Sequence, residues 1–241
     1  MPSYNSEKYI SDSINSVLKQ TYANFELIII DDASTDSSRK IIKSFLKKDN
    51  RIKAIFSKNN RGVSTSRNKG INASKGKYIA FLDSDDIWLE DKLKKQVKFM
   101  EEKNISFCCC DYEFISEDNT KLNRKVPVPV KTNYNQLLKY NTIGCLTVMI
   151  NKEKIKNIYM KKVFHEDYIA WLEIAKQGYQ IYGIQETLAL YRKRKKSVSN
   201  NKINAAKWTW YILRNIEGLS LFKSIKCFSF YAIKNIKKHI F

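Results

Sequence analysis

The amino-acid sequence predicts an α/β protein with a doubly wound, mostly parallel sheet and helices on both faces. Short apolar runs alternate with longer segments in which apolar residues recur every three or four positions, the patterns of buried strands and of amphipathic helices. Three carboxylates, those of Asp83, Asp85 and Asp86, directly follow one apolar run. Ligand sites in open α/β sheets lie beyond such strand ends.

The order of these segments gives the topology. Strands are expected at 25–30, 52–56, 78–82 and 105–114, and helices at 6–18, 41–46, 63–73 and from Trp88 to Met100. This alternation is typical of parallel strands joined by crossover helices. Residues 1–5 read as the end of a strand whose body is missing, so we expect either an apolar strand upstream of Met1 in the native gene or a truncated and less stable product.

The pattern loosens between residues 117 and 132, where Pro127 and Pro129 keep the backbone extended. A short helix near 134–140, a strand near 145–150, a helix opening at Glu166 and two strand-like runs, 181–184 and 188–191, are expected next. From Leu219 onward, isoleucines and phenylalanines fall on one side of a helix and lysines on the other. Such a tail either docks on the domain or lies on an anionic membrane surface.

Composition bounds the partners. The 241 residues carry 44 Lys and Arg against 24 Asp and Glu, a formal net charge of +20. This excess permits nucleic acid, an anionic membrane or a phosphorylated substrate, but part of it reflects a composition rich in lysine, asparagine and isoleucine. No nucleic-acid recognition motif is present, so nucleic acid is not expected as a partner.

Cysteine usage and the lack of a long apolar stretch bound the location. Three of the five cysteines are consecutive, Cys108 to Cys110, inside an apolar run. The cysteines have neither disulfide nor zinc spacing, so buried thiols in a reducing cytoplasm are expected. No stretch approaches the roughly 20 apolar residues of a spanning helix. We expect a cytoplasmic protein, with peripheral attachment to the inner membrane face as the alternative.

The carboxylates at 83–86 predict a metal site. Asp83 and Asp85 are one residue apart and can converge from one side of a strand end. Like charges this close need a cation, and hard oxygen ligands suit Mg²⁺ or Mn²⁺, which would be shared with a substrate diphosphate. The alternative is that these residues cap a helix beginning near Trp88.

Asp31 and Asp32 follow a second buried strand, so they should reach the same rim of the sheet. One of them is expected to cap the next helix. The other could accept hydrogen bonds from a nucleobase or a sugar hydroxyl, as acidic residues do at strand ends of nucleotide-binding folds.

Four segments in this order resemble the family 2 glycosyltransferases with the GT-A fold. They are Pro2–Asn5, Gln20–Asp36, Gly62–Gly70 and Gly76–Asp86. The resemblance implies an inverting transferase that uses a nucleotide-diphosphate sugar, usually a UDP-sugar, with Mg²⁺ or Mn²⁺. The acceptor would be a saccharide or a lipid-linked oligosaccharide in cell-surface polysaccharide synthesis.

The resemblance also implies roles for single residues. Pro2, Tyr4 and Asp32 would contact the nucleotide, and Arg67 the nucleotide or its diphosphate. Asp83 would lie by the ribose and the metal, with Asp85 as the principal metal ligand.

The segment from His165 to Tyr168 resembles the family's acidic motif that supplies the general base. This implies Asp167 as the base and Glu166 as the reserve, although acidic residues are also simply favourable at a helix N-terminus. Near the end of the domain, Arg194 stands where the family often has a histidine. An arginine cannot ligate metal but can neutralise a diphosphate. The alternative for 192–196 is a solvated basic loop.

We therefore expect residues 1–116 to form a nucleotide-sugar-binding half, 117–199 an acceptor and catalytic-base half, and 200–241 a helical tail. The alternative to an active transferase is a catalytically inactive module that binds a nucleotide sugar.

Overall fold

The computed structural model describes residues 1–194 and 202–240, with side chains omitted at 202, 203 and 235–240. Its first part is a three-stranded, fully parallel sheet in the order β1, β2, β3. These strands are β1 (Pro2–Ser3), β2 (Leu27–Asp31) and β3 (Ile52–Phe56). Every residue of β2 is buried, as expected for a strand covered on both faces.

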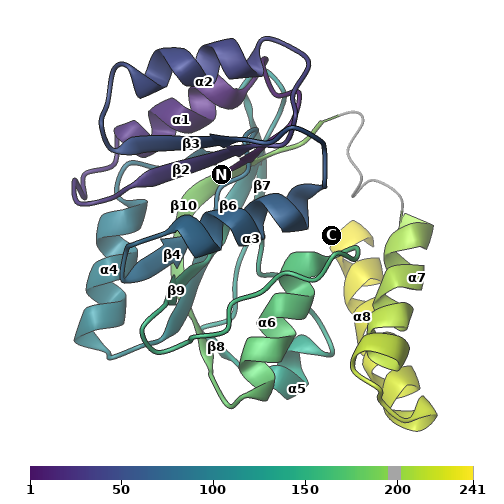
Figure 1. The fold of residues 1–241 in the computed structure, drawn as a ribbon. Coiled ribbons are helices and arrows are strands. Elements are labelled where there is room, and N and C mark those ends of the chain that lie inside the picture. Colours follow the sequence, from purple (N-terminus) through teal and green to yellow (C-terminus); the bar gives the residue numbers. More distant parts are fainter. Residues whose placement is uncertain (195–201, 241) are drawn as a thin grey trace.

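Helices cover both faces of this sheet, as the sequence predicts (Figure 1). On one side lie α1 (Ile10–Leu18) and α2 (Ser38–Leu46), and on the other lies α3 (Val63–Ala73). The packing follows the apolar spacing of the sequence, because Ile10, Ile14 and Val17 of α1 are all buried. Within residues 1–5, Pro2 and Ser3 form the short β1, in which Pro2 lies opposite Ile30.

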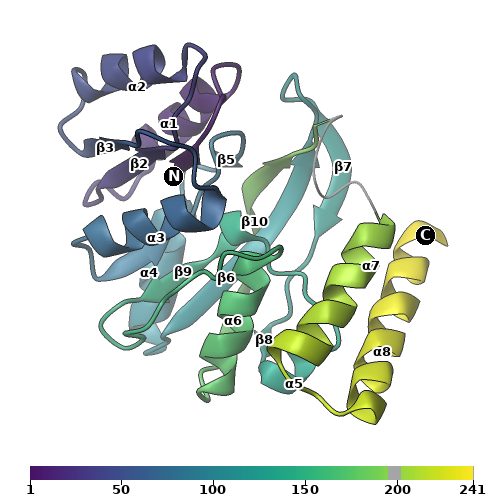
Figure 2. The same ribbon diagram turned by 45° about the vertical axis from the view of Figure 1, so that its right-hand side comes forward.

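The second sheet has seven strands within the described residues. They are β4 (Tyr78–Ala80), β5 (Ile87–Trp88), β6 (Phe107–Ile115), β7 (Lys121–Val126), β8 (Lys131–Thr132), β9 (Met149–Asn151) and β10 (Ile181–Arg192). The long pair β6 and β10 is parallel, whereas the other pairings are antiparallel. Against this sheet pack α4 (Lys92–Glu102), α5 (Tyr134–Leu137) and α6 (Glu166–Lys176) (Figure 2).

Four expected elements differ in the structure. The helix expected from Trp88 begins at Lys92, because Ile87 and Trp88 pair with β10 instead. The region expected to be irregular, 117–132, contains β7 and β8. The two strand-like runs near the end of the domain form one strand, β10, with register shifts between Ile184 and Ala189. The expected strand at 145–150 is shortened by a 3₁₀ turn, η1 (Cys145–Thr147).

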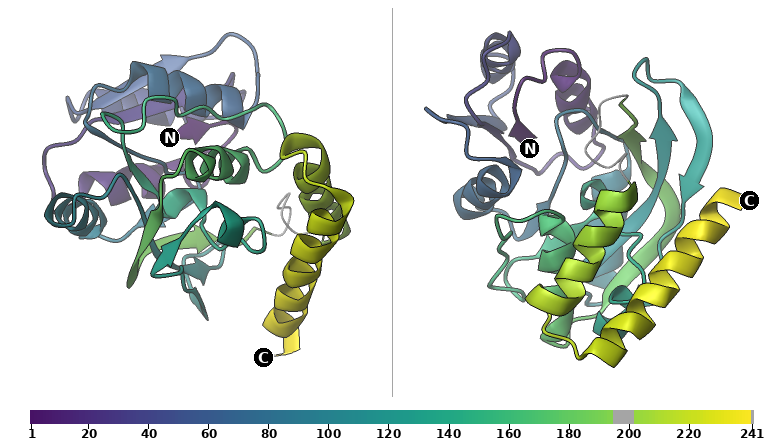
Figure 3. Two further views of the ribbon diagram at one scale, coloured as in Figure 1. Left: turned by 90° about the horizontal axis from the view of Figure 1, so that it is seen from below. Right: turned by 90° about the vertical axis from the view of Figure 1, so that its right-hand side faces the viewer.

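The described part of the tail consists of α7 (Lys202–Tyr211), the π-helical turn η3 (Ile212–Ile216) and α8 (Leu221–Ile240). The apolar pattern from Leu219 indicated α8 but not α7. Ile212 and Leu213 are buried in the same apolar core as Trp171 of α6, and Glu217 accepts a hydrogen bond from Tyr134 at 2.6 Å. The tail therefore docks on the domain, with α7 and α8 side by side (Figures 2 and 3).

All five cysteines are buried and free of disulfides. Burial raises the pKa of the Cys108, Cys109 and Cys110 thiols, so these side chains behave as apolar core residues. Among the described helices, none has the length and apolar character needed to cross a bilayer.

A cavity of about 440 Å³ lies between the two sheets. Its walls include Met1, Leu27 and Ile28 on one side and Tyr78 to Ala80 on the other. The strands β1 and β4 are each the last strand of their own sheet. Arg67 reaches this boundary from α3, and the candidate site lies around it.

Candidate active site

The side chain of Arg67 lies at the centre of the site and is only 5% exposed. Its Nη2 donates to both carboxylate oxygens of Asp83, at 2.6 and 2.8 Å, and its Nη1 donates to Oε1 of Glu166. Burial lowers the pKa of Arg67, but the nearby carboxylates outweigh it and the pKa is well above its usual value. Arg67 is thus a permanent charge that fixes two predicted site residues at once.

Three separate elements bring these groups together. Arg67 lies on α3, Asp83 follows β4, and Glu166 is the first residue of α6. Asn68 stabilises this arrangement, because its side chain donates to the carbonyl of Met160 at 2.8 Å and accepts from the Met160 amide at 2.9 Å. Asn68 therefore ties the segment before α6 to α3. Sequence reasoning missed it, since nothing in the sequence links two residues 92 positions apart.

The two candidate bases have different surroundings. Glu166 is ion-paired with Arg67, and its pKa is raised, first by burial and then by Asp167, against the opposing effect of Arg67. Asp167 is half-buried and accepts from the backbone amide of Tyr168 at 2.8 Å. It has no ion pair with any residue in the described ranges. Asp167 is therefore the carboxylate in this pair that is not committed to a guanidinium.

The acidic segment after β4 forms a turn, in which the Asp86 amide donates to the Asp83 carbonyl at 3.2 Å. It caps no helix, because α4 begins after Asp91. The helix-cap interpretation of this segment is therefore wrong. Oδ2 of Asp85 is 2.9 Å from Nε of Arg194, so the structure brings these two predicted site residues together. Burial, followed by the charge of Asp83, raises the pKa of Asp85.

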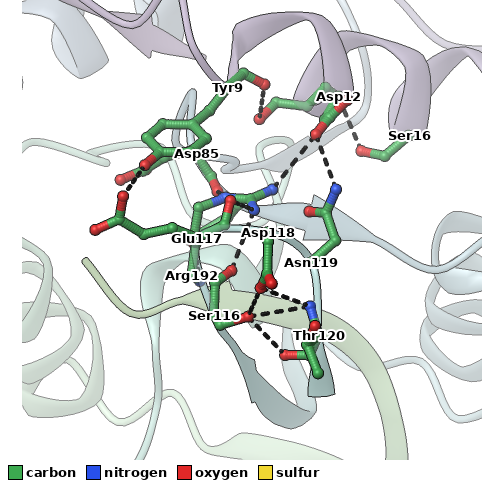
Figure 4. A network of polar contacts seen from close by, with 12 residues as sticks. Tyr9, Asp12, Ser16, Asp85, Ser116, Glu117, Asp118, Asn119, Thr120 and Arg192 are labelled. Atoms are coloured by element: carbon green, nitrogen blue, oxygen red, sulfur yellow. Dashed lines mark hydrogen bonds and ion pairs between the residues drawn. The ribbon is translucent and has the colours of Figure 1, made fainter. Parts of the chain in front are cut away.

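Arg192 anchors this turn from below (Figure 4). Its side chain is fully buried and its Nε donates to the carbonyl of Asp85 at 2.7 Å. Its Nη1 donates to the carbonyls of Ser116 and Glu117, and the guanidinium lies 4.7 Å from the centre of the Tyr9 ring. Arg192 is therefore not part of a solvated loop. Nothing in the sequence marks Arg192 as buried, because it stands among lysines and another arginine. The solvated-loop interpretation also covered residues 195 and 196, which lie outside the described residues.

The two aspartates at the end of β2, Asp31 and Asp32, are both buried, and neither caps α2. Asp31 pairs with Arg39 at 2.6 Å, and the Ser38 amide at the start of α2 donates to Asp36 instead. Asp32 accepts from the backbone amides of Arg61 and Gly62, at 3.0 and 2.7 Å. The expected cap is thus wrong for both residues, because Asp32 holds the start of α3 rather than that of α2.

The predicted nucleotide contacts at the chain start lie near this rim. Pro2 of β1 pairs with Ile30 of β2 and lines the cavity. Tyr4, just after β1, is 50% exposed. Asp32 is joined to them by its amide, which donates to the carbonyl of Ser3 at 2.8 Å. Pro2, Tyr4 and Asp32 therefore lie on one rim, and their contacts with a nucleotide stay a prediction.

The acidic turn suits a divalent cation that is completed by a substrate. Residues 1–194 and 202–240 hold no group of three or more side chains able to ligate a metal. Mg²⁺, however, typically takes only one or two protein carboxylates and fills its shell with water and substrate phosphates. Asp85 and Asp83 lie in the same turn, and the charge of Asp83 adds to burial in raising the pKa of Asp85. Asp83 is bound to Arg67 and Asp85 to Arg194, so a metal held by these two carboxylates stays a prediction.

Comparisons with known proteins agree on one family. The family model for glycosyl transferase family 2 matches residues 1–164. The putative teichuronic acid biosynthesis glycosyltransferase TuaG of Bacillus subtilis is 42% identical over 99% of this chain and 95% of its own length. The UDP-Glc:alpha-D-GlcNAc-diphosphoundecaprenol beta-1,3-glucosyltransferase WfgD of Escherichia coli is 40% identical over 100% of this chain and 94% of its own.

Solved structures show the same fold at lower identity. Staphylococcus aureus TarS 1-349 in complex with UDP has a TM-score of 0.68 at 21% identity, over 89% of this chain and 64% of that chain. The mannosyltransferase PcManGT from Pyrobaculum calidifontis, in complex with GDP-Man and Mn²⁺, has a TM-score of 0.71 at 16% identity, over 96% of this chain and 67% of that chain. The predicted GT-A fold is confirmed, and the chain belongs to glycosyltransferase family 2.

Proposed function

We propose that this enzyme transfers a sugar from a UDP-sugar to a lipid-linked saccharide, with inversion, in the synthesis of a cell-surface polysaccharide. The observation that carries the proposal is the Arg67 bridge, which holds Asp83 of the acidic turn and Glu166 at the start of α6 on one guanidinium. The name of WfgD, a UDP-Glc enzyme acting on a diphosphoundecaprenol-linked sugar, supports this choice of donor and acceptor.

The donor would lie along the rim formed by β1, β2 and the acidic turn. Tyr4 and Asp32 would contact the nucleoside, with Pro2 beside them, and Asp83 would lie by the ribose. A divalent cation, held by Asp85 and Asp83, would stabilise negative charge on the departing diphosphate. Arg194, which already contacts Asp85, would add positive charge on the same side.

The acceptor would approach from the side of α6. Its hydroxyl oxygen attacks the anomeric carbon opposite the diphosphate, so the new glycosidic bond forms as the bond to the phosphate oxygen breaks. Asp167 takes the hydroxyl proton. One carboxylate suffices for this single displacement, and Asp167 suits the role because Glu166 is held by Arg67. Glu166 remains the reserve base and positions Arg67.

The proposal is tested by measuring release of UDP from a panel of UDP-sugars with Mg²⁺ or Mn²⁺ and lipid-linked saccharide acceptors. Loss of a general base typically costs about 10² to 10⁴ in rate, so Asp167→Asn should lower turnover by that factor with little change in donor binding. Glu173→Gln is the matched control, because Glu173 lies on the same helix and pairs with Lys161 at the surface. It should keep full turnover.

A second candidate function is a catalytically inactive module that binds a nucleotide sugar. The ion pair between Asp85 and Arg194 favours it, since a built-in cation next to the metal carboxylate could neutralise a bound diphosphate without a metal. This candidate requires donor binding with no turnover. If wild type and Asp167→Asn bound the donor and released UDP equally slowly with every acceptor, the transferase proposal would fail.

A further inference from the structure

We propose that α8 docks on the surface of an anionic lipid bilayer through one exposed apolar stripe. The stripe consists of Phe222, Ile225 and Ile233, whose exposed fractions are 81%, 50% and 52%. We call it the α8 stripe. Large apolar side chains this exposed, gathered on one helix, mark an interaction surface rather than scattered surface residues.

The stripe follows from the way α8 packs. One face of the helix is buried, including Ser224 and Cys227. Cys227 belongs to the same apolar core as Trp171 of α6, and the Phe228 ring lies 5.5 Å from that of Trp210 on α7. At helical spacing, Phe222, Ile225 and Ile233 project from the opposite face. Docking on the domain therefore uses one side of α8 and leaves the α8 stripe exposed. The helix α8 itself lies at the edge of the molecule (Figure 3).

Charge identifies the partner as an anionic surface. Lys223 and Lys226 are exposed near the stripe, and the sequence of α8 contains no acidic residue. A helix with apolar residues next to lysines binds the interface of anionic membranes, where each basic residue near the surface strengthens attraction. A neutral protein partner would not need this arrangement.

The tail also contacts the segment that carries the catalytic base. Trp208 of α7 packs on Phe164, with ring centres 4.5 Å apart, and Phe164 is two residues before Glu166. α7 and α8 lie side by side (Figures 2 and 3). A bilayer bound by α8 would therefore lie near the acceptor side of the site. The purpose of the docking, though not the docking itself, rests on the proposed lipid-linked acceptor.

The test is co-sedimentation of the full chain with vesicles of phosphatidylcholine alone and of equal parts phosphatidylcholine and phosphatidylglycerol. Binding is expected only to the anionic vesicles and should weaken with salt. Lys223→Glu with Lys226→Glu should weaken it more than about 25-fold, because each lysine contributes about fivefold. Phe222→Ser with Ile225→Ser should weaken it by a factor of about 100 or more, from lost apolar burial.

Matched controls come from distant surfaces. Lys40→Glu with Lys47→Glu changes exposed lysines at α2, at the other end of the molecule (Figure 1). Ile55→Ser with Leu122→Ser removes exposed apolar side chains from β3 and β7. Both pairs should bind vesicles as wild type within about threefold, because the altered side chains lie far from the membrane surface and charges beyond a Debye length are screened. Equal weakening by the α2 pair would mean that net charge, not α8, drives binding.

Two further measurements separate the possible failures. Sedimentation velocity without lipid should show a monomer for wild type. A dimer that dissociates in Phe222→Ser would assign the α8 stripe to a second copy and overturn the membrane proposal. UDP release with a water-soluble saccharide acceptor should be unchanged in the α8 variants. Vesicle binding without any UDP release would leave the docking intact and refute only the proposed function.

Discussion

Replacing Arg67 with methionine tests most directly whether this side chain holds the site together, because it bridges Asp83 and Glu166. The exposed fractions of the three side chains are 5% for Arg67, 29% for Asp83 and 14% for Glu166. Removing one partner of a buried ion pair costs about 3 to 5 kcal/mol. Since the two carboxylates retain some solvent contact, we expect a loss of about 3 kcal/mol in the free energy of unfolding at neutral pH.

The loss should depend on pH, with a sign that follows from Glu166. Burial raises the pKa of Glu166 and Arg67 opposes that rise, so the pKa of Glu166 climbs further in Arg67→Met. When the pKa of a carboxyl group is higher in the folded state than in the unfolded state, the free energy of unfolding falls as the pH rises, because the folded state releases this proton less readily. The deficit of the variant should therefore be larger near about pH 7 than near about pH 5.

Urea unfolding followed by circular dichroism at the two pH values measures both effects. Arg51→Met is the matched control, because Arg51 forms a surface pair with Asp49, with exposed fractions of 31% and 18%. It should cost less than about 1 kcal/mol at either pH. If Arg67→Met lost no more stability than Arg51→Met, or lost the same amount at both pH values, Arg67 would not be holding Asp83 and Glu166 as charged partners.

Three more changes give measurable outcomes. Asp85→Ala should abolish metal-dependent transfer, with an unchanged circular dichroism spectrum, whereas Asp49→Ala on the surface should not; retained full activity would remove Asp85 from the metal site. Arg192→Met removes the anchor of the acidic turn and should cost about 3 to 5 kcal/mol by urea unfolding; an unaltered midpoint would contradict the anchoring role. Burial lowers the pKa of Lys92 to about 8 from 10.5, so wild type should gain on the order of 3 kcal/mol in stability as the pH rises through that window, and Lys92→Met should lose this gain; parallel pH profiles would contradict it.

Local pattern was enough to predict most of the sheet and the rim of the site. Buried strands such as β2 are continuous apolar runs, and acidic residues placed directly after them must reach the same edge. The start of α6 was predictable for a similar reason, since Glu166 and Asp167 precede a helical apolar stripe. Neither argument needs knowledge of distant contacts.

The remainder depended on contacts that local pattern does not encode. Arg67 and Glu166 are 99 positions apart, so their pairing exists only in the folded chain. β7 was missed because it is an edge strand that, among the described strands, pairs with β6 alone and is mostly exposed, which leaves it without an apolar alternation. α7 lacks a single apolar face in the sequence, since residues such as Trp208 and Trp210 contact different neighbours.

The cavity between β1 and β4 has a consequence for how the enzyme moves. No ladder of backbone hydrogen bonds joins the two sheets within the described residues. Side chains join them instead, among them the Arg67 bridge and the hydrogen bond from the Trp88 amide to Ser16. Amide hydrogen exchange should therefore resolve two cooperative units, one per sheet, with separate opening free energies. The rim formed by β1, β2 and the acidic turn lies between these units, where local opening breaks no hydrogen bonds between paired strands.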